Sequence, residues 1–307
     1  MELLKQLCNI HSPSGEEFRV KDFLLQYINE HKGNWFSQPE IFHGDEFQDS
    51  LILVFGRPRT AIYAHMDNIG YTVKYNGEIV KIGGSLSESN IALIGEDSMG
   101  EIECFSKKEE GNGEDAILKY VASRDIDRGT SLRYKMNFRE TDEFISSCYL
   151  DNRLGIYVAL KIAETLENGA IAFTCNEEHG GGNAQKLASH LWEKYKVRQA
   201  LIADITWVTE GVEHGKGVAI SLRDSCIPRR QYVNKIIKIA KQSKIPYQLE
   251  VEAFGGSDGA MIQKSTLPID WCFVGAAEDN VHTPDETVHK ADIVSMIDLY
   301  KELMEKL

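Results

Sequence analysis

The chain lacks any long hydrophobic run: none of its 307 residues lies in a stretch of about 18 apolar residues, the length that a helix needs to cross a bilayer. Its N-terminus also lacks the basic start and the apolar segment of a signal peptide. Positive charge is scarce, since 34 lysines and arginines face 47 acids, for a formal net charge of −13. Nucleic-acid binding needs a basic surface that releases counterions from phosphates. We therefore expect a cytoplasmic protein with neither nucleic-acid nor membrane partners.

Closely paired cysteines are also absent. The six cysteines are scattered along the chain, and several lie in apolar runs, where a thiol behaves as a small hydrophobic group. This pattern favours a reducing cytoplasm over an oxidising compartment. The hydrophobic content of 42% and the charged content of 26% are ordinary for a globular protein.

Strands and helices alternate through most of the sequence. A helix is predicted over Gly15–Glu30, with Ser14 and Glu17 at capping-box spacing. After residue 147, helical and apolar strand patterns follow one another, which predicts an α/β fold with a mostly parallel central sheet flanked by helices. Between residues 70 and 146, period-two alternation and glycine turns, the clearest at Gly111–Gly113, predict an inserted, barrel-like β domain. The main domain then comprises residues 1–69 and 147–307.

Metal-binding side chains stand at the ends of several apolar runs. These are His65 after Thr60–Ala64, Glu177 and Glu178 after Ala170–Asn176, Asp204 after Ala200–Ala203, and His282 shortly after Trp271–Ala277, while Asp151 opens an amphipathic helix. Because such strand ends gather on one edge of a parallel sheet, we expect these side chains to converge on one crevice. Imidazole and carboxylate ligands without thiolate suit zinc, cobalt or manganese.

Each of these residues also has a structural interpretation. His65 and Asp67 can form a simple turn, or Asp67 can hold a metal-binding ring by its second nitrogen. Asp151 can be a plain helix N-cap or a carboxylate that bridges two cations. The adjacent acids Glu177 and Glu178 form either a solvated turn or a site where cations relieve their repulsion. In the second case one acid binds metal and the other faces the reacting water, and their spacing does not tell which.

Two further residues complete the pattern. Asp204 lies in an otherwise apolar strand, so its charge needs a cation or a strong partner. His282 precedes Thr283-Pro284 and by itself is a turn histidine. If Asp151, Glu178 and Asp204 are ionised beside two divalent ions, a bridging hydroxide makes the cluster neutral and supplies the nucleophile of a hydrolase. The sequence thus predicts a two-metal hydrolase.

The order and spacing of these motifs resemble those of a known family. The shared segments are Ser12-Pro13-Ser14-Gly15, His65-Met66-Asp67-Asn68-Ile69-Gly70, Ile82-Gly83-Gly84, Leu150-Asp151-Asn152-Arg153, Glu177-Glu178, Asp204-Ile205-Thr206, Gly215-Lys216-Gly217, Gly256-Ser257-Asp258 and His282-Thr283-Pro284. Through nearly its whole length, the chain resembles the glutamyl/lysyl/deblocking aminopeptidases. These are dinuclear-metal enzymes of the zinc-peptidase-like exopeptidases that assemble as tetrahedral particles.

The resemblance implies a role for each residue. One metal ion would be held by His65, Asp151 and Asp204, and the other by Asp151, Glu178 and His282. As general base, Glu177 would take a proton from the metal-bridging water, and the resulting hydroxide would attack the scissile carbonyl. Asp67 would orient His65.

The resemblance also implies cofactors and partners. We expect two divalent metal ions per subunit, zinc foremost and cobalt or manganese otherwise, and peptide substrates that lose their N-terminal residue. A homo-oligomer between a dimer and a dodecamer is expected, with the segment 70–146 covering the site and contributing subunit contacts. The acidic composition is a weak hint toward basic substrates.

Two other functions fit the same residues. A related dinuclear-metal amidohydrolase, either an N-acyl amino acid deacylase or a carboxypeptidase, would use the same water activation, and a requirement for a free amine separates it from an aminopeptidase. A non-catalytic metal-binding scaffold could keep the fold without the reaction. The chain departs from the expected family pattern in the glycine-rich loop His179–Asn183 and in Ser257, where a threonine is expected.

Overall fold

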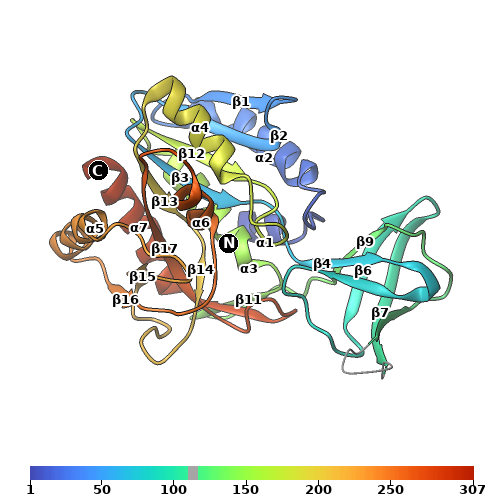
Figure 1. Cartoon of the computed structure of the whole chain (residues 1–307). Helices are drawn as coiled ribbons and strands as arrows, with labels where there is room; N and C mark the ends of the chain where they lie inside the picture. Colours follow the sequence, from blue (N-terminus) through green and yellow to red (C-terminus); the bar gives the residue numbers. More distant parts are fainter. Residues whose placement is uncertain (110–116) are drawn as a thin grey trace.

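Two β-sheets organise the chain, and Figure 1 shows the smaller one standing to one side of the larger. The computed structural model describes residues 1–109 and 117–307, so the predicted break at Gly111–Gly113 lies outside the described residues. Within these residues, no helix combines the length and the apolar character that a membrane crossing requires.

The larger sheet has parallel strands at its centre and antiparallel strands at its edges. Its order is β1 (Glu40–Gly44), β2 (Gln48–Phe55), β12 (Gly169–Thr174), β3 (Thr60–His65), β13 (Gln199–Ile202), β17 (Asp270–Asp279), β18 (Glu286–His289), β11 (Phe144–Ser147) and β10 (Arg139–Glu140), with β14 (Ile205–Trp207), β15 (Val218–Ser221) and β16 (Tyr247–Glu250) attached beside β17. The neighbours β12, β3, β13 and β17 all run parallel. The predicted α/β fold with a mostly parallel central sheet is confirmed.

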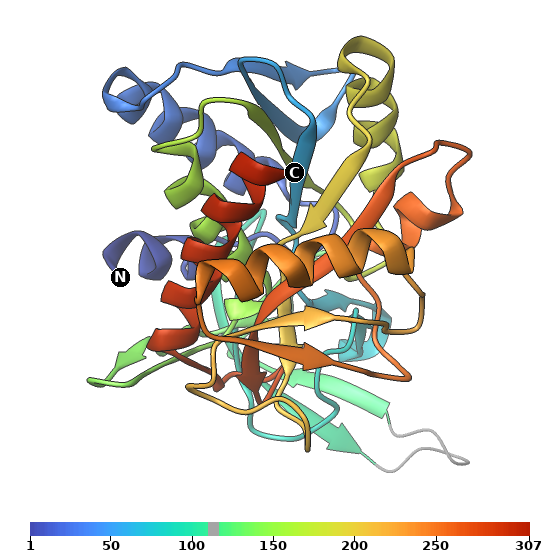
Figure 2. The same ribbon diagram turned by 90° about the vertical axis from the view of Figure 1, so that its left-hand side faces the viewer.

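Helices cover both faces of this sheet. One face carries α1 (Glu2–Cys8), α2 (Phe18–His31), α3 (Leu150–Ala163), α5 (Arg230–Ser243) and α7 (Lys290–Lys306), and the other carries α4 (Ala184–Tyr195) and α6 (Asp258–Lys264). Figure 2 shows α5 and α7 together on the first face. Side chains alternate across a strand, so Ile62 packs with the first group and Tyr63 with the second. Apolar residues on both faces of a strand are typical of parallel sheets.

The predicted capping box at the start of α2 is wrong, and the helix begins at Phe18 without a side-chain cap. The hydroxyl of Ser14 instead donates to Asp67 Oδ2 at 2.6 Å. The carboxylate of Glu17 accepts hydrogen bonds from the backbone N–H groups of Gly15 and Asn176, both at 2.9 Å. Both side chains therefore tie the N-terminal segment to loops that are remote in sequence.

The prediction that α3 is amphipathic is also wrong. All of its residues except Lys161 are buried, so the helix packs inside the molecule on all sides. Its buried Arg153 guanidinium donates to the carbonyl oxygens of Leu7 and Met66 and to a side-chain oxygen of Asn68. These bonds satisfy a charged group that would otherwise be costly to bury.

The smaller sheet is the predicted barrel-like unit. Its strands are, in spatial order, β5 (Ile79–Ile82), β4 (Gly70–Val73), β9 (Ser131–Tyr134), β6 (Ala92–Asp97), β7 (Gly100–Glu109) and β8 (Ile117–Val121). An isolated bridge between Glu78 and Lys119 joins its two edges, so the sheet nearly closes. The strands β10 and β11 follow it in sequence but pair within the larger sheet. The boundaries 70–146 stay a prediction.

Candidate metal centre

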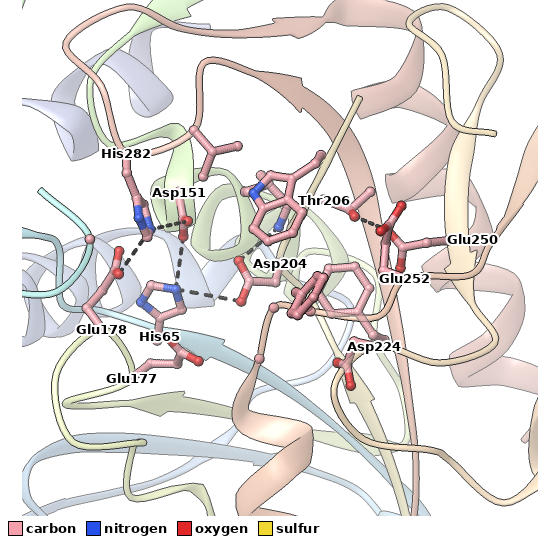
Figure 3. Close-up of a pocket in the computed structure, with 18 residues that line it drawn as sticks. His65, Asp151, Glu177, Glu178, Asp204, Thr206, Asp224, Glu250, Glu252 and His282 are labelled. Atoms are coloured by element: carbon pink, nitrogen blue, oxygen red, sulfur yellow. Dashed lines mark hydrogen bonds and ion pairs between the residues drawn. The ribbon is translucent and has the colours of Figure 1, made fainter. Parts of the chain in front are cut away.

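Five of the predicted site residues lie together at the carboxyl ends of the central strands. His65 is the last residue of β3, Asp204 follows β13, Glu178 follows β12, His282 follows β17, and Asp151 lies in the first turn of α3. All five line one cavity of about 250 Å³, and Figure 3 shows their side chains pointing toward one another. The carboxyl ends of parallel strands are where α/β proteins bind their ligands.

Asp151 occupies the middle of the cluster, between the two imidazoles. Its Oδ1 lies 3.1 Å from His65 Nε2, and its Oδ2 lies 3.3 Å from His282 Nε2. On one side, His65 Nε2 is 3.6 Å from Asp204 Oδ2. On the other side, His282 Nε2 is 3.1 Å from Glu178 Oε2. The donor atoms thus form two neighbouring groups that share one carboxylate.

Burial makes this cluster of acids costly without nearby positive charge. Burial raises the pKa of Glu178, and the charge of Asp151 raises it further. Burial likewise raises the pKa of Asp204 well above its ordinary value. Burial opposes the charge on His282, but the carboxylates of Asp151 and Glu178 outweigh it and raise the pKa of the imidazole to about 11. Groups with perturbed pKa values are typical of functional sites, and buried acids of this kind are stabilised by nearby positive charge.

Glu177 stands apart from these two groups. Its side chain lines the cavity but makes no hydrogen bond or ion pair with any described residue. Burial, reinforced by the neighbouring charges of Glu178 and Asp258, raises its pKa to about 8, although His65 counteracts the shift. A carboxyl group with such a pKa can both accept and return a proton near neutral pH.

Asp67 organises the loop that carries both glutamates. Its Oδ1 accepts a hydrogen bond from Glu177 N and its Oδ2 accepts one from Glu178 N, both at 3.0 Å. The ring of His65 lies closer to the backbone of Asp67 than to its carboxylate, since Nδ1 is 3.2 Å from the carbonyl oxygen and 3.4 Å from Oδ1. The predicted contact with His65 is therefore shared between the main chain and the side chain.

Some groups at the site were not anticipated in these roles. Glu286 Oε1 accepts from His282 N at 3.1 Å, and its Oε2 accepts from Asp151 N at 3.3 Å. From the smaller sheet, the hydroxyl of Tyr134 donates to the carbonyl oxygen of His282 at 3.1 Å. Gly84 lies so close to the His282 ring that a side chain would not fit. The sequence signal for Glu286 was weak: an acid four residues beyond His282 in a short strand.

Comparison with known proteins identifies the family of this chain. The sequence profile of the M42 glutamyl aminopeptidase family matches residues 119–299. A curated protein of Acetivibrio thermocellus, named "Putative aminopeptidase", is 25% identical over 98% of this chain and 97% of its own.

Solved structures share the fold. An aminopeptidase from the archaeon Desulfurococcus kamchatkensis is 22% identical, with a TM-score of 0.85 over 100% of this chain and 94% of that one. The TET1 peptidase of Pyrococcus horikoshii is 22% identical, with a TM-score of 0.80 over 100% of this chain and 99% of that one. Because its profile matches more than half of the sequence, the chain belongs to the M42 glutamyl aminopeptidase family and is a hydrolase of peptide bonds.

Proposed function

We propose that this protein is a dinuclear-metal aminopeptidase. One divalent ion would be held by His65, Asp151 and Asp204, and the other by Asp151, Glu178 and His282, with zinc the first candidate and cobalt or manganese the others. The observation that carries this proposal is the position of Asp151, whose two carboxylate oxygens face two different imidazoles at 3.1 and 3.3 Å. A carboxylate placed in this way suits the bridging position of a two-metal site.

The chemistry of the donors supports cations at this place. His65, Asp151 and Glu178 offer ligand atoms that all lie within 4.8 Å of one another. Glu178 Oε1 is buried and has no hydrogen-bond partner among the described residues, so it can bind a further group. No lysine or arginine is among the described residues that line the cavity. Divalent ions would balance these buried acids.

Two ions bound here would polarise the scissile carbonyl and lower the pKa of a water molecule. The residues of the chain supply the proton transfers. Glu177, which makes no competing contact, would accept a proton from that water and return it to the leaving amine. Asp67 would fix the backbone on which Glu177 is carried, since it accepts the N–H groups of Glu177 and Glu178.

The cavity favours an aminopeptidase over the related amidohydrolases. Substrates of N-acyl amino acid deacylases and of carboxypeptidases carry a free carboxylate, which is normally bound by arginine or lysine. The described residues that line this cavity include no arginine or lysine, but they do include several acids. The free amine of a peptide N-terminus carries the opposite charge and is compatible with this wall. Short peptides are thus the proposed substrates.

Cleavage of matched peptides tests this function. The metal-loaded protein would be incubated with short peptides in free and N-acetylated forms, and the products followed by mass spectrometry. We expect loss of single residues from free N-termini only. Glu177→Gln keeps the shape of the side chain and removes the base, so it should lower kcat by about 10² to 10⁴-fold while both ions stay bound. Cleavage of acetylated peptides or from the C-terminus would contradict the proposal.

We further propose that residues 1–69 and 147–307 form the catalytic domain and that residues 70–146 form a lid. Contacts of Gly84 and Tyr134 with His282 support this division, since both residues belong to the smaller unit.

A homo-oligomer between a dimer and a dodecamer is proposed because a structural neighbour is described as a dodecamer. Phe105 and Val121 of the smaller sheet are about half exposed and could pack against another subunit. Light scattering coupled to size-exclusion chromatography measures the subunit number.

The proposed location is the cytoplasm. All six cysteines are free, and five of them are buried. Free cysteines fit a reducing compartment. Fractionation of the native cells, with detection of the protein by antibody, tests this location.

A further inference from the structure

The cavity has a second polar wall formed by Asp224, Glu250 and Glu252, here called the acidic wall. The strands β15 and β16 pair in parallel and end at Ser221 and Glu250, so these acids lie at or just beyond their carboxyl ends. Hydrogen bonds continue between the two segments past the strands, from Leu222 N to Glu250 O and from Glu252 N to Arg223 O. Figure 3 shows the acidic wall on the far side of the cavity from His282.

Protein groups do not neutralise the acidic wall. Asp224 and Glu250 are only 9% and 3% exposed, and neither they nor Glu252 form an ion pair with any described residue. The charge of Arg223 acts on Asp224 but is outweighed by burial. The Nε of Arg223 donates to the backbone carbonyl oxygens of Asp224 and Glu252, at 3.2 and 3.1 Å, rather than to their carboxylates.

Asp224 and Glu250 each accept only one hydrogen bond from a described residue, which offsets little of the cost of burying their charges. Glu250 accepts one bond from the Thr206 hydroxyl, and Asp224 accepts one from Cys226 N at 2.6 Å. Burial raises the pKa of both Asp224 and Glu250, and the charge of Glu252 raises that of Glu250 further. Buried carboxylates of this kind are stabilised by a cation that enters from outside.

Aromatic side chains line the same cavity as His65, His282 and the acidic wall. They are Trp207, Phe254 and Phe273, of which the first two are 40% and 76% exposed. Such rings can pack against an aliphatic chain and can also attract a cation over their faces. A residue that combines an apolar stem with a positive tip therefore complements both parts of the cavity.

We infer that this cavity selects peptides whose N-terminal residue is lysine or arginine, with the stem packed on the aromatic rings and the charged tip at the acidic wall. This inference rests on the proposed function, because it assumes that the N-terminal residue enters the cavity beside His65 and His282. Asp224, Glu250 and Glu252 are then residues that determine specificity rather than residues that react.

Norleucine provides the matched comparison, because it has the stem of lysine without the ammonium group. We would measure kcat/KM of the metal-loaded protein for lysyl and norleucyl peptides of otherwise equal sequence. The lysyl peptide should be preferred by at least about tenfold, and Glu252→Gln or Asp224→Asn should each reduce that preference by about tenfold. Glu193→Gln on α4, an exposed acid outside the cavity, is the control and should leave the preference unchanged.

A binding experiment separates this inference from the proposed reaction. Calorimetric titration with lysinamide and norleucinamide measures side-chain recognition without any cleavage. Tighter binding of lysinamide, weakened by Glu252→Gln, supports the inference even if no peptide is cleaved, and the proposed function alone then fails. Cleavage of norleucyl peptides as fast as lysyl peptides, with equal binding of the two amides, overturns the inference and leaves the aminopeptidase function intact. Absence of both cleavage and binding overturns both.

Discussion

Gly84, in the loop after β5, lies directly against the imidazole of His282, and a methyl group at this position would overlap the ring. A loop of the smaller unit thus contacts a residue that follows β17 of the larger sheet. Since the backbone of Gly84 is not in the left-handed region, space is the only reason that a larger residue is disfavoured here.

The Gly84→Ala variant should bind its metal ions more weakly. Displacement of the His282 ring would remove a proposed metal ligand from its place, and changes beside metal ligands typically reduce affinity by about 10 to 100-fold. Competition with a chromophoric chelator measures this affinity. Gly33→Ala is the control, because nothing lies within 4 Å of the added methyl group. Equal affinities for the two variants would show that the smaller sheet does not position His282.

Metal content should depend on Asp151 more than on either histidine. Because Asp151 lies between both imidazoles, Asp151→Ala should lose both ions under conditions in which His65→Ala and His282→Ala each retain one. Inductively coupled plasma mass spectrometry of the dialysed proteins measures the stoichiometry, and Glu193→Gln should retain two ions. Retention of two ions by Asp151→Ala would rule out a bridging role.

The Asp67→Asn variant should have a lower kcat than Ser14→Ala. Asp67 accepts hydrogen bonds from Glu177 N, Glu178 N and the hydroxyl of Ser14. The amide NH2 of an asparagine is a hydrogen-bond donor and would face one of these three donors instead of accepting from it. The loop that carries Glu177 should therefore move, and kcat should fall by at least about tenfold. Loss of the Ser14 hydroxyl removes one hydrogen bond, worth about 1 kcal/mol. Steady-state kinetics, with thermal unfolding to compare stability, measure both effects. Similar kcat values would contradict the proposed role of Asp67.

Stability should depend on pH through Asp258. This acid is buried, one of its oxygens accepts from the Thr174 hydroxyl at 2.5 Å, and the other has no partner among the described residues. Burial raises its pKa from 3.8 to about 6. The folded state therefore holds a proton that the unfolded state releases, and the associated stability is present below pH 4 and is lost as the pH rises through 6.

Asp258→Asn removes this dependence. Relative to the native protein, the variant should gain up to about 3 kcal/mol in free energy of unfolding between pH 4 and pH 7. Urea denaturation at several pH values, followed by circular dichroism, measures the difference. A constant difference between the two proteins across this range would show that Asp258 titrates normally.

Local sequence rules failed where distant partners competed. Ser14 and Glu17 have capping-box spacing, yet their side chains bind Asp67 and Asn176, which lie 53 and 159 residues away. Polar residues in α3 suggested an exposed face, but Arg153 finds its partners at Leu7 in α1 and at Met66 just after β3, and can therefore be buried. A local pattern does not contain these contacts.

The sequence by itself determined the fold class and indicated which side chains would gather at one edge of the sheet. Apolar strands that alternate with helices form a parallel sheet, and the carboxyl ends of such strands share one edge, so residues as distant as His65 and His282 could be expected to meet. Residue type was sufficient here because several imidazoles and carboxylates at the ends of neighbouring strands are rarely needed for folding alone.

Only the tertiary structure decided how these groups are arranged and what surrounds them. It placed Asp151 between the imidazoles, brought Gly84 of the loop after β5 and Tyr134 of β9 onto His282, and set the acidic wall on the far side of the cavity from His282. These relationships depend on the direction of side chains and on pairing between segments far apart in the chain, such as the one that joins Arg223 to Glu252. The periodicity of a sequence carries no information on either.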